Sequence, residues 1–196
     1  MKKSSIFAVL SAIFAGCLLP FTALAHTGVG HTTGFAAGFA HPLGGADHML
    51  AMVAVGLWAA QMGGRATWAV PSAFVSMMLV GGTLGVAGMQ IPFIEQGILL
   101  SLLVLGLLIA GAVRLPLIIS GILVGLFAIY HGHAHGAEMP MEMGALSYSA
   151  GFAFATALLH AAGIASGFGL QKLHFEKLTR YAGGLIALGG VYLAVS

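Results

Sequence analysis

Six apolar segments follow one another along the chain after residue 40, separated by short turns that contain glycine, proline or charged residues. Each is close to the roughly 20 residues that a helix needs to cross a bilayer. They run approximately over Pro42–Met62, Trp68–Ala87, Pro92–Ala112, Leu115–Tyr130, Ala145–Leu170 and Tyr181–Val195. Because the turns are brief and no linker interrupts them, the pattern predicts an all-α integral membrane protein. We expect six transmembrane helices in one domain over residues 26–196.

The first 25 residues have a different pattern, that of a secretory signal peptide. Two lysines precede an apolar run over Ile6–Leu19, and an A-x-A sequence ends at Ala25. Cleavage after Ala25 would leave His26 as the new N-terminus. A retained signal anchor, or a lipoprotein box ending at Cys17, are the alternatives.

Composition supports a membrane protein and narrows its chemistry. The chain is 59% hydrophobic and 6% charged, whereas soluble domains have about 45–50% apolar and ~25% charged residues. The net charge of +2 is too small to indicate a nucleic-acid partner. Cys17 is the only cysteine and would be removed with the signal. Disulfides, cysteine-based zinc sites and a cysteine nucleophile are then excluded from the mature chain.

The basic residues predict the orientation. All lysines and arginines after the signal lie in alternate loops, at Arg65, Arg114, Lys172, Lys177 and Arg180. The positive-inside rule makes that side cytoplasmic, so both termini are expected in the periplasm and the protein in the bacterial inner membrane. Most histidines and two glutamates then face the periplasm or the outer rim: His26, His31, His41, His131, His133, His135, Glu138 and Glu142. A histidine set this one-sided suggests collection of a solute from outside.

A first polar stretch, His41–His48, opens the first apolar segment and contains Asp47, the only aspartate of the chain. A carboxylate at membrane depth is costly and by default functional. On a helix that starts at Pro42, His41 would lie at the mouth, with Asp47 and His48 deeper. Imidazole nitrogen and carboxylate oxygen are ligands for a borderline divalent ion. Alternatively, Asp47 caps a broken helix and His48 bonds to a neighbouring helix.

A second polar stretch follows the fourth apolar segment. His131, His135, Glu138 and Glu142 have i, i+4, i+7, i+11 spacing, so an extended helix would place all four on one face. His133 would point elsewhere. Gly132 and Gly136 argue against a rigid extension, so a loop folded back over the mouth is equally open. A merely solvated outer loop is the third alternative.

Further side chains allow two interpretations each. His160, in the middle of the fifth segment, is either a core hydrogen-bonding residue or the deepest ligand of a pathway. The thioethers of Met139, Met141 and Met143 suit Cu(I), but methionine also fills apolar gaps. Trp58 and Trp68 flank the first loop and are predicted to anchor it at the membrane interface.

These stretches resemble the HupE/UreJ family. The H-P-x-x-G-x-D-H pattern over His41–His48, followed by Val55–Ala59, is similar to the family's first signature. Tyr130–Glu138 (YHGHAHGAE) is similar to its second signature, with tyrosine in place of the usual phenylalanine, and Gly151–Gly163 to its fifth span. The resemblance implies a nickel or cobalt permease linked to hydrogenase or urease maturation.

The sequence thus predicts uptake of Ni²⁺ or Co²⁺ from periplasm to cytoplasm by a non-enzymatic permease with no prosthetic group. The candidate metal ligands are His26, His31, His41, Asp47, His48, His131, His135, Glu138 and His160. Uptake should weaken as pH falls through the imidazole range, because the ligands must be deprotonated. Three alternatives stay open: an intramembrane metal-dependent hydrolase, a copper-handling protein and a haem-bearing electron carrier. The choice between nickel and cobalt, the energy source and the oligomeric state are undecided.

Overall fold

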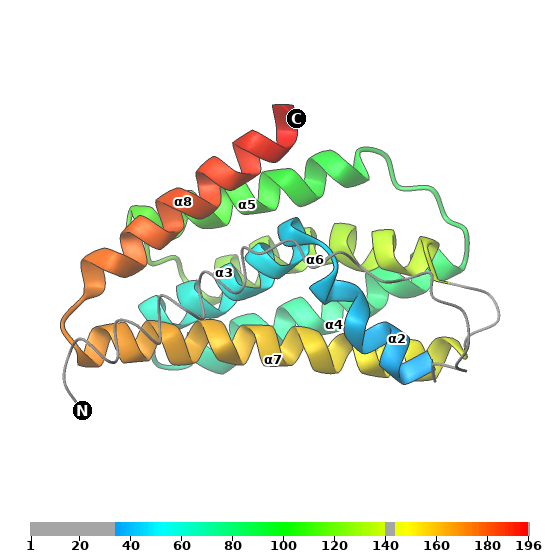
Figure 1. The fold of residues 1–196 in the computed structure, drawn as a ribbon, viewed down its shortest axis with the longest axis horizontal. Helices are drawn as coiled ribbons and strands as arrows, with labels where there is room; N and C mark the ends of the chain where they lie inside the picture. Colours follow the sequence, from blue (N-terminus) through cyan, green and yellow to red (C-terminus); the bar gives the residue numbers. More distant parts are fainter. Residues whose placement is uncertain (1–33, 140–143, 196) are drawn as a thin grey trace.

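The structure is a computed structural model that describes residues 34–139 and 144–195. Every regular element in these ranges is helical, which confirms the predicted all-α class (Figure 1). The elements are α2 (Gly34–Ala40), the 3-10 helix η1 (His41–Leu43), α3 (Ala46–Met62), α4 (Ala66–Val86), α5 (Ile94–Ala110), α6 (Leu117–Ala137), α7 (Ala145–Lys172) and α8 (Glu176–Val195). The predicted signal peptide with Cys17, and also His26, His31, Met141, Glu142 and Met143, lie outside the described residues.

Four of the described helices, α4, α6, α7 and α8, are long and apolar enough to cross a membrane. The segments Gly34–Leu43 and Ala46–Met62 pass the same test only together, and they are bent by 83°. The described residues therefore contain four candidate membrane spans, or five if the bent pair counts as one, as fits a multi-pass membrane protein. Helix α5 is apolar but has only 17 residues, fewer than the other candidate spans. The prediction of six spans is therefore neither confirmed nor contradicted.

The first predicted span is not the continuous helix that the sequence indicated. Gly34–Ala40 already forms an unpredicted short helix, and His41–Leu43 continue it as a 3-10 turn. The chain then breaks at Gly44 and Gly45, the latter in an extended conformation, before α3 begins. Two consecutive glycines disfavour a continuous helix, because their backbone loses much conformational entropy on ordering. The break places His41 on one limb of the bend and Asp47 in the first turn of the other.

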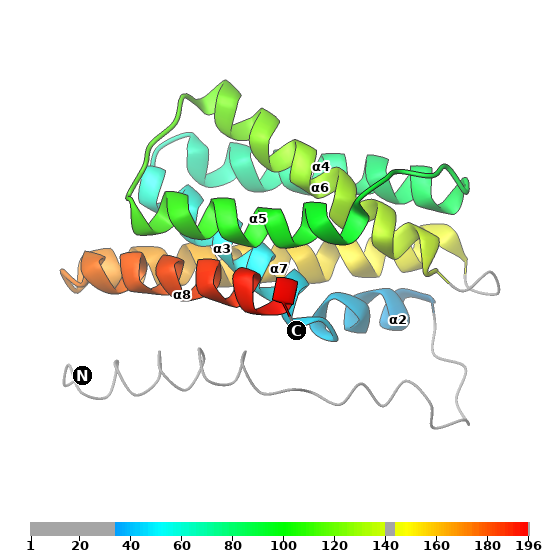
Figure 2. The ribbon, with the colours of Figure 1, turned by 90° about the horizontal axis from the view of Figure 1, so that it is seen from above.

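The helices pack chiefly in pairs, α4 with α6, α5 with α8 and α3 with α7 (Figure 2). Glycines let these backbones approach closely, as small residues do in membrane bundles. A Cβ atom on Gly56 of α3 would overlap the backbone of His160 on α7. Gly106 of α5 and Gly183 of α8 meet in the same way. The glycines at these contacts therefore serve helix packing.

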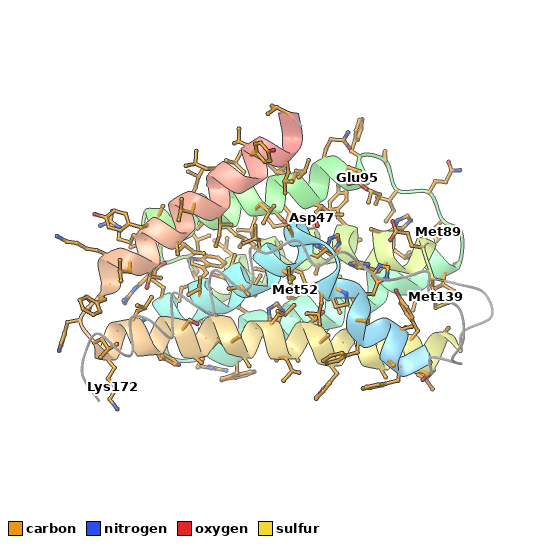
Figure 3. All side chains as sticks on the ribbon, viewed as in Figure 1. Asp47, Met52, Met89, Glu95, Met139 and Lys172 are labelled. Carbon is orange, nitrogen blue, oxygen red and sulfur yellow. The ribbon has the colours of Figure 1, made fainter. Side chains whose placement is uncertain are left out.

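Long side chains join the turns at the basic end of the bundle. The Trp58 indole donates a hydrogen bond to the Val113 carbonyl at 2.9 Å, and Arg180 Nε donates one to the Ala110 carbonyl at 2.8 Å. These bonds tie the end of α3 and the start of α8 to the α5–α6 turn. Lys172 lies at this end, opposite Met89 and Met139 (Figure 3). The three turns with basic residues therefore share one end, as the charge pattern predicted.

The two tryptophans beside the first loop differ in exposure. Trp68 is 60% exposed, which suits a side chain at the bundle surface, whereas Trp58 is fully buried. The prediction that Trp58 anchors the loop at the membrane interface is therefore wrong. Its indole instead spans the bundle interior to reach the α5–α6 turn, because a buried N–H needs an acceptor.

Candidate metal site

The start of α3 holds Asp47 and His48 together. One carboxylate oxygen of Asp47, Oδ1, accepts hydrogen bonds from the His48 backbone N–H at 2.8 Å and from His48 Nδ1 at 3.0 Å. His48 is buried and Asp47 partly exposed. Since a carboxylate can only accept, the His48 ring carries its proton on Nδ1 and leaves a lone pair on Nε2. The aspartate thus orients the imidazole beside it, and its other oxygen forms no hydrogen bond with the described residues.

Helix α6 continues through the second polar stretch to Ala137, which resolves the alternative of a folded-back loop. Gly132 and Gly136, expected to weaken this helix, instead pack against α4. A Cβ on Gly132 would overlap the Met78 carbonyl, and one on Gly136 the Gly82 carbonyl. The close contact holds this end of α6 in the bundle, where His131 and His135 are both buried one turn apart.

Three side chains meet at the outer end of this arrangement. His41 Nε2 lies 3.4 Å from Glu138 Oε2. The part of the chain that the structure describes has one group of three or more His, Cys, Asp or Glu side chains whose ligand atoms all lie within 4.8 Å of one another. This group is His41, His135 and Glu138. His41 comes from η1, His135 from the last turn of α6 and Glu138 from the residue directly after that helix. The bend before α3 is therefore what brings the first polar stretch to the second.

The imidazoles form a continuous series from this end towards the middle of the bundle. The ring of His135 lies 4.5 Å from that of His41 and 4.1 Å from that of His48, between centroids. The His48 ring lies in turn 4.7 Å from that of His131. Figure 3 shows the surroundings, with Asp47 and Met52 in the central part of the bundle and Met139 near its end. Four histidines from three elements are thus in successive ring contact.

Phe74 separates this series from His160. The phenyl ring, fully buried on α4, lies 5.7 Å from the His131 ring and 5.1 Å from the His160 ring. His160 Nδ1 donates a 2.7 Å hydrogen bond to the Met52 carbonyl. The sequence did not identify Phe74 as part of the site, because one more aromatic residue in an apolar helix carries no distinguishing signal.

Several imidazole nitrogens are buried with no hydrogen-bond partner among the described residues. They are His48 Nε2, His131 Nδ1, His133 Nδ1, His160 Nε2 and both ring nitrogens of His135, and all except His133 Nδ1 belong to the series or to His160 beyond it. A buried donor or acceptor without a hydrogen-bond partner costs about 1–3 kcal/mol. This many unsatisfied ring nitrogens in one place therefore need an explanation. In His48 and His160, the other ring nitrogen donates to an oxygen that can only accept. Such outer partners are typical of metal-ligating histidines, whose free nitrogen they aim at the ion.

Other polar candidates lie apart from the series. His133 points away, as predicted, and its Nε2 donates to the Met89 carbonyl in the α4–α5 turn. Met139 lines a groove together with His135, Met78 and Tyr148. His174 lies in the α7–α8 turn, at the basic end. The arrangement therefore offers mainly imidazole nitrogen, with carboxylate oxygen from Asp47 and Glu138, a donor set for borderline divalent ions.

Ser101 also belongs to these surroundings and was missed from the sequence. Its hydroxyl lies 3.0 Å from His131 Nε2, and both side chains are fully buried. The available signal was a single serine in the otherwise apolar run of α5. That signal shows a polar group in the bundle but does not identify its partner, which lies on another helix.

Comparison with known proteins gives two matches. The family model described as "HupE / UreJ protein" matches residues 14–193. The curated "Protein HupE" of Rhizobium leguminosarum bv. viciae is 47% identical over 199 residues, with all of both chains covered. No solved structure matches.

Proposed function

The chain belongs to the HupE/UreJ family, and from that premise we propose that it is a permease that takes up Ni²⁺ or Co²⁺. The observation that carries the proposal is the series of buried imidazoles whose free nitrogens have no partner among the described residues. A divalent cation supplies the partner that the lone-pair nitrogen of each of these rings lacks. Neighbouring ligand groups that lie within a few ångströms also let the ion exchange one partner at a time, without full rehydration.

The first contact is assigned to His41, His135 and Glu138. Glu138 is the most exposed of the three, with a 64% exposed side chain, and His41 is 32% exposed. An ion that loses its water here gains a carboxylate charge in exchange. The proposed role of His26 and His31, which lie outside the described residues, is to capture the ion before this step.

The second position is assigned to His48, His131 and Asp47. Both histidines are buried, so the ion there would be largely dehydrated. Desolvating a cation is costly unless a charge compensates it. Asp47 supplies that charge in two ways. Its Oδ1 atom acts on the ion through His48, and its other oxygen acts on the ion directly. His160, on the far side of Phe74, is the proposed innermost contact.

The orientation follows from the basic turns. Arg65 and Arg114 lie in turns, and Lys172 at the end of α7, all at one end of the bundle, which we assign to the cytoplasm. The bent pair α2–α3, α5 and the four longer helices would then make six spans with both termini in the periplasm, in the bacterial inner membrane. The imported metal would serve hydrogenase or urease maturation, the role that the family resemblance implies.

Metal uptake by cells tests the proposal. Cells that lack their own nickel and cobalt permeases would express the chain and be given radioactive Ni²⁺ or Co²⁺, with and without a protonophore. Uptake of at least one ion above the empty-vector level is expected. The His48→Ala, His131→Ala double variant is the matched negative control, because it removes two of the proposed ligands. If the wild-type protein reaches the membrane but neither ion accumulates, the proposal is wrong.

A further inference from the structure

We propose that Ser101 of α5 is a positioning residue that fixes the proton on Nε2 of His131, so that Nδ1 is always free for the metal ion. This inference rests on the proposed function for its effect on transport, but the proton position itself does not depend on it. Among the described residues, the Ser101 hydroxyl forms hydrogen bonds only with the Ile98 carbonyl and with His131, so it acts on the site through that ring.

The hydrogen bonds of Ser101 leave one consistent arrangement of protons. The hydroxyl has a single proton, and its oxygen lies 2.6 Å from the Ile98 carbonyl and 3.0 Å from His131 Nε2. A carbonyl oxygen can only accept, so the hydroxyl proton must lie between Ser101 and Ile98. The contact between the Ser101 oxygen and His131 Nε2 then needs a proton from the histidine. His131 Nε2 therefore carries the ring proton and donates it to the Ser101 oxygen.

The reverse arrangement is excluded by the shorter contact. If the hydroxyl donated to His131, its oxygen and that of Ile98 would face each other at 2.6 Å with no proton between them. Two oxygen lone pairs at this distance repel. Both Ser101 and His131 are fully buried, so water does not replace the missing proton. The short bond from Ser101 to its own helix therefore determines the tautomer of a histidine on α6.

The tautomer decides whether His131 can bind a cation. With the proton on Nε2, the buried Nδ1 presents a lone pair, and this atom has no partner among the described residues. A proton on Nδ1 would instead block the same position. Removal of the hydroxyl leaves nothing to hold the proton on Nε2, and loss of such outer partners typically weakens metal binding by roughly 10–100-fold.

Transport by Ser101→Ala is the first part of the test. The variant should need a roughly 10–100-fold higher Ni²⁺ or Co²⁺ concentration for half-maximal uptake, at equal protein in the membrane. Ser120→Ala is the matched control. Ser120 is also fully buried in the bundle, but among the described residues its hydroxyl forms hydrogen bonds only with Leu115, Pro116 and Met62, near the basic end. Equal uptake constants for the two variants would overturn the proposal.

The proton position is the second part, and it can be measured without metal. Nitrogen-15 NMR of the purified full-length protein, labelled at histidine and kept in chelator, distinguishes protonated from unprotonated ring nitrogens. Comparison with His131→Gln identifies the His131 signals. The wild type should show a protonated Nε2 and a bare Nδ1, and Ser101→Ala a changed distribution. A wild-type proton on Nδ1, or an unchanged tautomer in Ser101→Ala, overturns the inference. Absent uptake by the wild type would overturn only the proposed function.

Discussion

The Cα of Gly132 on α6 faces the Met78 carbonyl on α4 so closely that a Cβ atom on the glycine would overlap that oxygen. Gly136 repeats the contact one turn later, against the Gly82 carbonyl. The two glycines therefore determine how near α6 lies to α4. His131 and His135 belong to the same two turns, so their position relative to His48 depends on these contacts.

The first prediction concerns this close packing. Gly132→Ala should separate α6 from α4 and lower both thermal stability and uptake, because overpacking a tight contact costs about 1–3 kcal/mol. Gly184→Ala is the control, since a Cβ there meets nothing within 4 Å in its helix α8. Melting curves in detergent and uptake assays measure the two effects. Equal melting temperatures for both variants would show that the contact does not set the helix spacing.

The second prediction concerns the outer mouth. Glu138→Gln removes the carboxylate that lies 3.4 Å from His41 but keeps the size of the side chain. The half-saturating metal concentration should rise by roughly 10-fold, with little change in maximal rate, because the buried ligands are intact. Glu176→Gln, an exposed residue in the first turn of α8, should leave both parameters unchanged. A lower maximal rate with unchanged half-saturation would place Glu138 outside the entry step.

The third prediction separates the two interpretations of His160. His160→Gln keeps an amide that can donate to the Met52 carbonyl but removes the free ring nitrogen. If His160 is the innermost contact, uptake per molecule should fall roughly 10-fold or more, while Ni²⁺ binding to the purified protein at the outer positions persists. Uptake assays together with calorimetric titration test this. Normal uptake would mean that His160 only joins α7 to α3 by its hydrogen bond.

The fourth prediction concerns orientation. A reporter that is active only in the periplasm, fused after Ser196, should be active, since six spans return the chain to the side of its exported N-terminus. The same reporter inserted in the α5–α6 turn, beside Arg114, should be inactive. An active reporter beside Arg114 would place the basic turns outside and contradict the assigned direction of transport.

The sequence predicted the long helices well, because an apolar run between charged turns is a strong and local signal. The bounds of α4 and α7 differ from expectation by at most two residues at either end. The sequence was less informative about the candidate metal site. It indicated a broken first helix only as an alternative and did not predict the 83° bend. After Tyr130 it left an extended helix and a folded-back loop equally open, and the structure has helix.

These failures have one physical cause. A glycine lowers helix propensity locally, yet the neighbouring helix decides whether that glycine breaks the chain or allows close packing. In α6 the Met78 and Gly82 carbonyls of α4 favour the second outcome. Partners such as Ser101 for His131 and the Met52 carbonyl for His160 are also contacts between helices. The spacing of residues along a single helix carries no information about contacts with another helix.

The charge of Asp47 is the most direct test of the account. Asp47→Asn keeps the size of the side chain and an oxygen that can accept from His48, but it removes the negative charge that compensates a dehydrated cation. The control is His174→Asn, an exposed position at the basic end whose φ of 60° asparagine tolerates.

The deciding measurement is Ni²⁺ and Co²⁺ uptake per molecule of protein in the membrane, for the wild type, Asp47→Asn and His174→Asn. If Asp47 compensates the charge of the ion, Asp47→Asn should lose uptake by roughly 100-fold or more at normal protein levels, while His174→Asn transports like the wild type. If Asp47→Asn lowers only the amount of protein and each remaining molecule transports normally, Asp47 is a structural cap of α3, and the assignment of the central metal position is contradicted.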